Sequence, residues 1–210
     1  FVTNILDVYL GQYSGESVIN FLKSGCIKAE RDAVCSVDNF ITATRASKNT
    51  WLSDERFAKT LDAYAEDDNI KKDAINSIRQ EYILSLATLH DKIKGRNTVR
   101  FITENIYSYL IKTGFDKRIG EYISYFKNHG NQYLARQYEN VWKTLIEVFD
   151  TLVYILGDKT VNLSDYRRYL TTALGQQKTG IIPTSLDEVM IGDLMRSKSE
   201  KVRYQFVIGA

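Results

Sequence analysis

The sequence contains little proline, cysteine or histidine, and this scarcity argues against several kinds of site. Of 210 residues, one is proline, two are cysteine and two are histidine. Cys26 and Cys35 lie outside any CxxC or CxH pattern, which favours free thiols over a disulfide or a metal site. His90 and His129 are isolated as well. For both histidines we expect a polar role within or at the end of a helix, rather than catalysis or metal binding.

Long apolar runs and a strong charge of one sign are missing too. No run approaches the roughly 18 residues that a membrane-spanning helix requires, and no charged-then-apolar leader opens the chain. The 28 basic and 26 acidic residues give a net charge of +2, which is too balanced to mark a nucleic-acid-binding protein by itself. We therefore expect a cytoplasmic protein with no membrane partner, in which any basic surface is local.

The common catalytic motifs are also missing. The sequence contains no GxxxxGK[ST] phosphate loop, GxGxxG, HExxH or GxSxG motif. We expect these residues to hold no cofactor or metal and to catalyse no reaction by themselves. The acidic run Glu66-Asp67-Asp68 precedes a predicted helix, so helix capping is favoured over acid–base catalysis. Six tyrosines in amphipathic segments are interpreted as packing residues rather than base-stacking ones: Tyr107, Tyr109, Tyr122, Tyr125, Tyr133 and Tyr138.

Apolar residues at spacings of three and four predict a helical bundle. One long helix is expected from about Asn69 to Lys94, and a second carries an apolar stripe from Leu134 to Ile155 that Trp142 and Phe149 widen. Shorter helices are predicted at Glu16–Lys23, Asp38–Thr44, Asp54–Ala65, Thr98–Lys112, Lys117–Asn128 and Ser164–Leu174, the last with Ser164 as its N-cap. Helix ends are expected at Gly25, Gly95, Gly114, Gly130, Gly157 and Gly175.

Strand patterns occur only near the end of the chain. Val189–Ile191 and Tyr204–Ile208 are short, β-branched or aromatic runs, and the segment Gln176–Ser185 before them carries the single proline. The sequence thus predicts a mainly α fold with a helical domain at 1–175, a linker at 176–185 and a strand–loop–strand at 186–210. Because two such strands have no sheet to join and the first residue is Phe, we expect an internal fragment of a larger protein.

The loop between these strands gathers cations and hydroxyls. Arg196, Lys198, Lys201 and Arg203 cluster there with two serines, Ser197 and Ser199. Such a loop can donate hydrogen bonds to phosphates. The spacing alone supports a solvated hairpin loop equally well.

The last segment, from Ile182 to Gly209, carries the pattern Ile-Pro-x-x-Leu-Asp-x-Val-x-x-Gly-x-x-x-Arg-Ser-[Arg/Lys], followed by a predicted strand ending in Val-Ile-Gly. This pattern resembles the AddB (RexB) family of bacterial helicase–exonuclease subunits. Looser similarities run in order along the rest of the chain: Val18-Ile-Asn-Phe-Leu-Lys-Ser-Gly25, Asp38-Asn-Phe-Ile with Trp51, and Val141-Trp142 with Leu156-Gly157-Asp158. The resemblance therefore touches nearly the whole chain.

This resemblance implies a parent protein that processes double-strand DNA breaks for homologous recombination, as a heterodimer with a helicase–nuclease A subunit. The parent would be an ATP-dependent exonuclease subunit, with ATP, Mg²⁺ and an iron–sulfur cluster bound outside these 210 residues. The helical part resembles the 2B domain of superfamily 1 helicases, and the terminal strand–loop–strand the edge of a RecA-like 2A domain. The fragment itself would be a noncatalytic helical module.

In this resemblance the terminal loop takes the place of helicase motif V, in a degenerate form. The pattern is Val-x-x-x-Thr-x-His-x-x-Lys-Gly-x-Glu. Of its positions from Thr onward, only the lysine is kept, as Lys198, and the substitutes are Asp193 for Thr, Met195 for His, Ser199 for Gly and Lys201 for Glu. An anionic Asp in place of a phosphate-binding hydroxyl argues against an active motor in this half. The DNA-binding candidates are Arg196, Ser197, Lys198 and Lys201. Two alternatives stay open: a helical protein-interaction domain unrelated to DNA, or part of an active superfamily 1 helicase.

Overall fold

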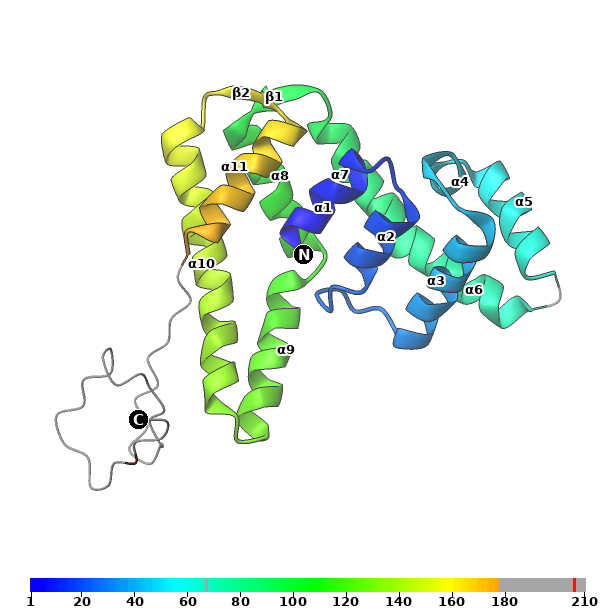
Figure 1. Ribbon diagram of the computed structural model, residues 1–210, viewed down its shortest axis with the longest axis horizontal. Coiled ribbons are helices and arrows are strands. Elements are labelled where there is room, and N and C mark those ends of the chain that lie inside the picture. Colours follow the sequence, from blue (N-terminus) through cyan, green and yellow to red (C-terminus); the bar gives the residue numbers. More distant parts are fainter. Residues whose placement is uncertain (67, 178–205, 207–210) are drawn as a thin grey trace. The chain divides into compact units, whose positions relative to one another are not determined.

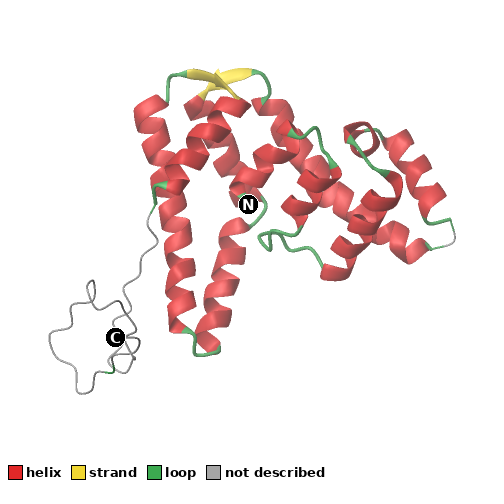
Figure 2. Ribbon diagram, in the orientation of Figure 1, coloured by secondary structure: helices red, strands yellow, loops and turns green. Residues whose placement is uncertain are grey.

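The computed structural model describes residues 1–66, 68–177 and 206. Almost every element in this part of the chain is a helix (Figure 2). In chain order the elements are α1 (Val2–Leu10), α2 (Gly15–Leu22), α3 (Arg31–Thr44), α4 (Lys48–Leu52), α5 (Asp54–Tyr64), α6 (Asn69–Ile78), the π-helical turn η1 (Arg79–Ile83), α7 (Leu84–Ile93), β1 (Arg96–Thr98), α8 (Val99–Lys112), α9 (Phe115–Asn128), α10 (Gln132–Leu156), β2 (Thr160–Asn162) and α11 (Leu163–Gly175). The mainly α fold predicted from the apolar spacing is confirmed.

The helices pack mostly with their neighbours in the chain. Helices α9 and α10 form a long antiparallel hairpin, and α8 and α11 pack against α10 (Figure 1). Helix α3 packs against α5 and α6, whereas α1 contacts α2 and α11. The contact between α1 and α11 is reinforced by an ion pair in which Arg167 donates to both carboxylate oxygens of Asp7. The first and last described helices are thereby held together.

The largest fully buried side chain is Trp51, on the short helix α4. Its ring centroid lies 5.6 Å from that of Phe40 and 5.9 Å from that of Phe57. Arg79 on η1 lies beside this aromatic cluster and is itself buried. The Arg79 Nε donates to the Trp51 carbonyl at 2.8 Å, and its Nη2 lies 2.6 Å from the carboxylate of Asp54. The buried guanidinium is therefore paired, as a charge removed from water must be.

The predicted helix from about Asn69 to Lys94 is present, but it is not uniform. A π-helical turn at Arg79–Ile83 separates α6 from α7. Such a turn inserts extra backbone and changes the direction of the following side chains, so that Arg79, Tyr82 and Ile83 are all buried. Ile70, which the spacing assigns to the apolar face, is 85% exposed in the first turn of α6.

Helix α10 matches the second long helix predicted from the sequence, but its apolar stripe is only partly buried. Leu145, Val148 and Leu152 are buried, whereas Val141 and Ile155 are exposed. The apolar stripe predicted from Leu134 to Ile155 is therefore uncovered at these two positions. The reason is that α9 packs only along the first part of α10, and α8 and α11 pack along the second part.

Two strands lie within the helical body, which corrects the expectation that strands are confined to the end of the chain. Strands β1 and β2 pair antiparallel, with Asn97 opposite Val161 (Figure 1). Val161 is buried, whereas Arg96, Thr160 and Asn162 are exposed. The predicted strands Val189–Ile191 and Tyr204–Ile208 and the linker at 176–185 fall wholly or largely outside the described residues, so that part of the domain division stays a prediction.

Several predicted helix boundaries also shift. The N-cap of α11 is Asn162, whose side chain accepts from the Asp165 amide, and not Ser164, which lies inside the helix. Helix α3 begins at Arg31, seven positions before the predicted Asp38, and α1 and α4 are additional helices. Of the six glycines expected at helix ends, four have left-handed backbone angles: Gly25, Gly95, Gly114 and Gly130. Gly157 keeps a helical angle as the C-cap of α10, and Gly175 is the last residue of α11.

Candidate functional site

The residues that the sequence predicts to contact DNA lie outside the described residues. These are Arg196, Ser197, Lys198 and Lys201. Their role in binding DNA stays a prediction.

The two cysteines and the Asp68 carboxylate, all in the described part of the chain, have environments typical of structural residues. Cys26 and Cys35 are free thiols, as expected. Asp68 caps α6 by accepting from the Lys71 amide, which confirms capping for that carboxylate. Within residues 1–66 and 68–177, no three His, Cys, Asp or Glu side chains gather in a way that could hold a metal ion. No helix described here is long and apolar enough to cross a membrane.

The tyrosines of the amphipathic segments are not all packing residues. Tyr109 is buried, and Tyr122 and Tyr138 are half-buried with ring centroids 5.2 Å apart. In contrast, Tyr107, Tyr125 and Tyr133 are exposed. The packing interpretation holds for the first three tyrosines and is wrong for the other three. Helical spacing alone does not show how much of each tyrosine side chain stays exposed to water.

The two histidines differ in their environment. His129 lies exposed at the end of α9, where its Nδ1 is 2.8 Å from the Tyr125 carbonyl oxygen. His90 is buried, and its ring nitrogens face Tyr13 Oη at 2.6 Å and the Ile5 carbonyl oxygen at 2.8 Å. Because a carbonyl only accepts, Nε2 carries the proton and Nδ1 accepts from the tyrosine hydroxyl. Burial lowers the pKa of His90 to about 4. Both histidines thus have the polar helix roles predicted.

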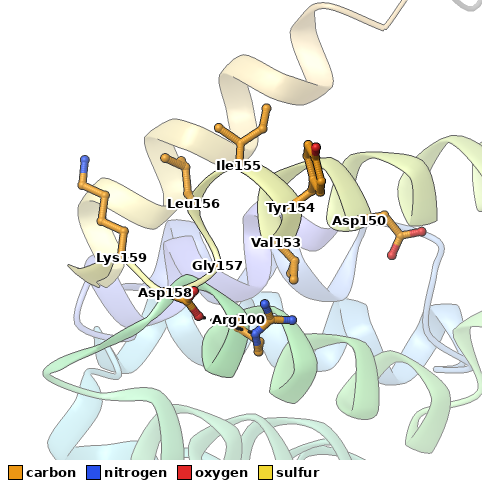
Figure 3. A pocket seen from close by; sticks show the side chains of 9 residues that line it. All are labelled: Arg100, Asp150, Val153, Tyr154, Ile155, Leu156, Gly157, Asp158 and Lys159. Carbon is orange, nitrogen blue, oxygen red and sulfur yellow. Dashed lines mark ion pairs between the residues drawn. The ribbon is translucent and has the colours of Figure 1, made fainter.

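The end of α10 borders an open hollow of about 620 Å³ (Figure 3). Its lining comes from α8 and from the last turns of α10 with the loop that follows: Arg100, Asp150, Val153, Tyr154, Ile155, Leu156, Gly157, Asp158 and Lys159. Tyr154 is 92% exposed, and Ile155 is exposed too. Two cations and two carboxylates balance in charge, so the hollow shows no preference for a charged ligand.

Gly157 fixes the geometry beside this hollow. The Arg100 amide donates to the Gly157 carbonyl at 3.0 Å, and the Val99 amide donates to the Lys159 carbonyl at 3.0 Å. The guanidinium of Arg100 lies against the turn at Gly157 and Asp158 (Figure 3). A Cβ placed on Gly157 would lie 2.3 Å from the Val153 carbonyl oxygen and 3.0 Å from Arg100 Nη2. Because the Val153 carbonyl belongs to the preceding turn of α10 and cannot move aside as a flexible side chain can, the end of this helix requires a glycine at position 157.

We expect the substitution Gly157→Ala to destabilise the fold by about 1–3 kcal/mol, because the added methyl group overpacks against backbone. The measurement is urea denaturation followed by circular dichroism. Gly120→Ala on α9 is the matched control, since a Cβ there meets nothing within 4 Å. Equal midpoints for the two variants would contradict the predicted clash with the Val153 carbonyl.

Two cations, Lys159 and Arg168, lie against the ring of Tyr169 on α11. Lys159 Nζ lies 3.2 Å from Tyr169 Oη, and the Arg168 guanidinium lies 5.6 Å from the centroid of the Tyr169 ring. Arg96 on β1 donates to the Thr160 carbonyl at 3.3 Å. We call Arg96, Lys159, Arg168 and Tyr169 the ribbon-end surface. The hydrogen bond from Lys159 lowers the pKa of the Tyr169 hydroxyl.

The ribbon-end surface has no signature in the sequence. Its cations are separated by 63 and 9 positions, and no local run of basic residues contains them. Only the pairing of β1 with β2 brings Arg96 next to the Lys159 loop. The near-neutral composition predicts that any basic surface is local. No other feature of the sequence indicates this surface.

Comparison with known proteins gives similarity along the whole chain. The chain is 28% identical to the B subunit of the ATP-dependent helicase/deoxyribonuclease of Acetivibrio thermocellus, over 214 aligned residues that cover 100% of this chain and 19% of that protein. Proteins of the same name are 27% identical in Clostridium acetobutylicum and 25% identical in Clostridioides difficile, each over 99% of this chain and over 19% and 18% of the respective relative. No protein-family model matches the chain.

The chain thus spans about a fifth of the length of the curated relatives that it matches. The similarity includes the helical part, where the sequence motifs are loose, as well as the terminal segment. The resemblance to the AddB family is confirmed: from end to end, this chain is homologous to a segment of the ATP-dependent helicase/deoxyribonuclease B subunits.

Proposed function

We propose that the chain is a noncatalytic helical module of the B subunit of a bacterial helicase–exonuclease that processes double-strand DNA breaks for homologous recombination. The observation that carries this proposal is the end-to-end similarity to proteins named as helicase/deoxyribonuclease B subunits. The mainly helical body is compatible with a 2B-like domain. The terminal segment at 186–210 is assigned to the edge of a 2A-like domain on the resemblance of its motif alone.

The noncatalytic part of the proposal rests on residue chemistry. The sequence lacks a phosphate loop and the common hydrolase motifs. Its version of motif V carries Asp193 where a phosphate-binding threonine is expected. Both features favour a module that supports or guides DNA over one that drives ATP hydrolysis. ATP, Mg²⁺ and an iron–sulfur cluster would then belong to other parts of the parent protein.

The proposed partners follow from the same assignment. The parent would bind DNA and pair with a helicase–nuclease A subunit, in the cytoplasm where chromosomal DNA is processed. The four loop residues Arg196, Ser197, Lys198 and Lys201 would contact the DNA backbone or an adjoining domain.

The test compares the 210-residue chain with the natural full-length polypeptide copurified with the A subunit. We expect the complex to degrade linear duplex DNA in an ATP-dependent reaction, and the 210-residue chain to hydrolyse no ATP and cut no DNA. ATP turnover by the chain alone that disappears on mutation of one of its own residues would overturn the noncatalytic assignment. A complex without action on DNA would favour the alternative, a helical protein-interaction domain.

A further inference from the structure

The ribbon-end surface combines donors that suit a phosphate group. Lys159 Nζ donates to Tyr169 Oη, which leaves the tyrosine proton free to point outward. The Arg168 guanidinium lies over the same ring, and its Nη2 is paired with Asp165 at 3.2 Å. The Arg168 side chain is 70% exposed. Ammonium, guanidinium and hydroxyl groups are the side-chain donors that most often contact phosphate oxygens of nucleic acids.

The three cations of this surface are exposed and only weakly neutralised. Arg96 and Lys159 have no acidic partner among the described residues, and Arg168 has only Asp165, three residues earlier on α11. Asp158, which precedes Lys159, lies 3.9 Å from Arg100, and both side chains of this pair are at least half exposed. Such exposed pairs contribute little to stability. The four cations Arg96, Arg100, Lys159 and Arg168 outnumber the carboxylates Asp158 and Asp165, so these six side chains carry a net charge of +2.

The cations are also held in place before any ligand arrives. The Tyr169 ring positions both Lys159 and Arg168, and the Thr160 carbonyl holds Arg96. The pairing of β2 with β1 fixes the loop at 157–159, which carries Lys159, and α11 follows β2 directly. Long cationic side chains lose rotamer freedom when they bind an anion, and prior ordering reduces that cost.

We propose that the ribbon-end surface is a contact site for the phosphate backbone of DNA, independent of base sequence and separate from the terminal loop at 196–201. This inference rests on the proposed function, which supplies DNA as the ligand. The surface would guide the nucleic acid along the helical body. Arg96, Lys159 and Arg168 would supply the positive charge, and Tyr169 would orient two of them.

The test is DNA binding by the natural full-length polypeptide with its A subunit, without ATP or divalent metal so that no DNA is cut. The variant carries Arg96→Ala, Lys159→Ala and Arg168→Ala, and the probe is a fluorescently labelled blunt duplex titrated over a range of salt concentrations. If all three cations contact phosphates, the slope of log affinity against log salt should fall by up to about 2.7 units, since each contact contributes about 0.9. A single-stranded probe of equal length shows which form of DNA occupies the surface.

The matched control removes three exposed cations elsewhere: Arg31→Ala, Arg56→Ala and Lys59→Ala. Both variants lose the same three charges, so an equal loss of slope in the two would reduce the effect to net charge and overturn the proposal. An unchanged slope and affinity for the ribbon-end variant would also overturn it. Circular dichroism melting should give wild-type midpoints for both.

The two proposals can fail separately. If the wild-type complex degrades duplex DNA but the ribbon-end variant keeps its full salt slope, only the contact site is wrong. If the complex binds duplex DNA through this surface but never degrades it, only the proposed function is wrong. A wild-type complex that does not bind DNA overturns both.

Discussion

We expect Trp51→Ala to destabilise the described body by about 3–5 kcal/mol, because truncation of a fully buried tryptophan leaves a cavity that its neighbours cannot fill. Trp51 is 0% exposed and packs against Phe40 and Phe57. Its carbonyl also accepts from the buried Arg79, so a shift of α4 would weaken the pairing of that charge. The measurement is the urea midpoint of unfolding by circular dichroism, with the free energy obtained by linear extrapolation.

Trp142→Ala is the matched control for this experiment. Trp142 is half-buried on α10, and its ring centroid lies 5.8 Å from that of Phe115 and 6.3 Å from that of Tyr107. The sequence predicts Trp142 as a packing residue beside the apolar stripe, and the structure places it at the edge of the core. We expect Trp142→Ala to lower the free energy of unfolding by about half as much as Trp51→Ala, because less of the Trp142 side chain is removed from water on folding. A larger effect at Trp142 would contradict the assignment of Trp51 as the main aromatic core residue.

The helices were predictable because each buries a repeating face. Helix α10 has apolar residues at spacings of four and three, and its extent agrees with the pattern from Leu134 to Ile155. What spacing cannot show is which neighbour covers each turn, so Val141 and Ile155 are exposed despite their place in the pattern. The π-helical turn at Arg79–Ile83 could not be predicted from the sequence for a related reason. Its flanking segments α6 and α7 both keep helical periodicity, and the extra backbone carries no residue signature.

The β1–β2 pair was unpredictable on different grounds. Each strand has three residues, too few for an alternating pattern to stand out. The pairing joins Arg96 to Asn162 across 66 positions, and it depends on how α8 and α10 pack. Because the ribbon-end surface is built on this pairing, it too could be found only in three dimensions. The terminal loop with Arg196 and Lys198 was found from the sequence, through its clustered cations and its motif resemblance, and its DNA role stays a prediction.

His90 gives the fold a dependence on acid that can be worked out from its surroundings. The ring is buried in α7 between α1 and the turn that follows it, with Tyr13 and Tyr9 packed edge-on at centroid distances of 5.6 Å and 5.2 Å. Burial lowers its pKa to about 4, although the Ile5 carbonyl and Asp91 act in the opposite direction and Lys48 adds to the lowering. The folded state therefore holds a neutral imidazole at pH 6, where the unfolded chain begins to bind a proton.

The stability that neutral His90 contributes should be fully present above about pH 6.5 and should be lost as the pH falls towards 4, because the unfolded chain takes up a proton that the folded state excludes. Between pH 7.5 and 5 this amounts to about 2 kcal/mol of unfolding free energy. Urea denaturation at a series of pH values measures it, and His90→Gln should remove this part of the pH dependence while lowering stability at every pH. His129→Gln is the control, since that ring lies exposed at the end of α9. If the wild type and His90→Gln lose the same free energy between these pH values, His90 is not the group that makes the fold sensitive to acid.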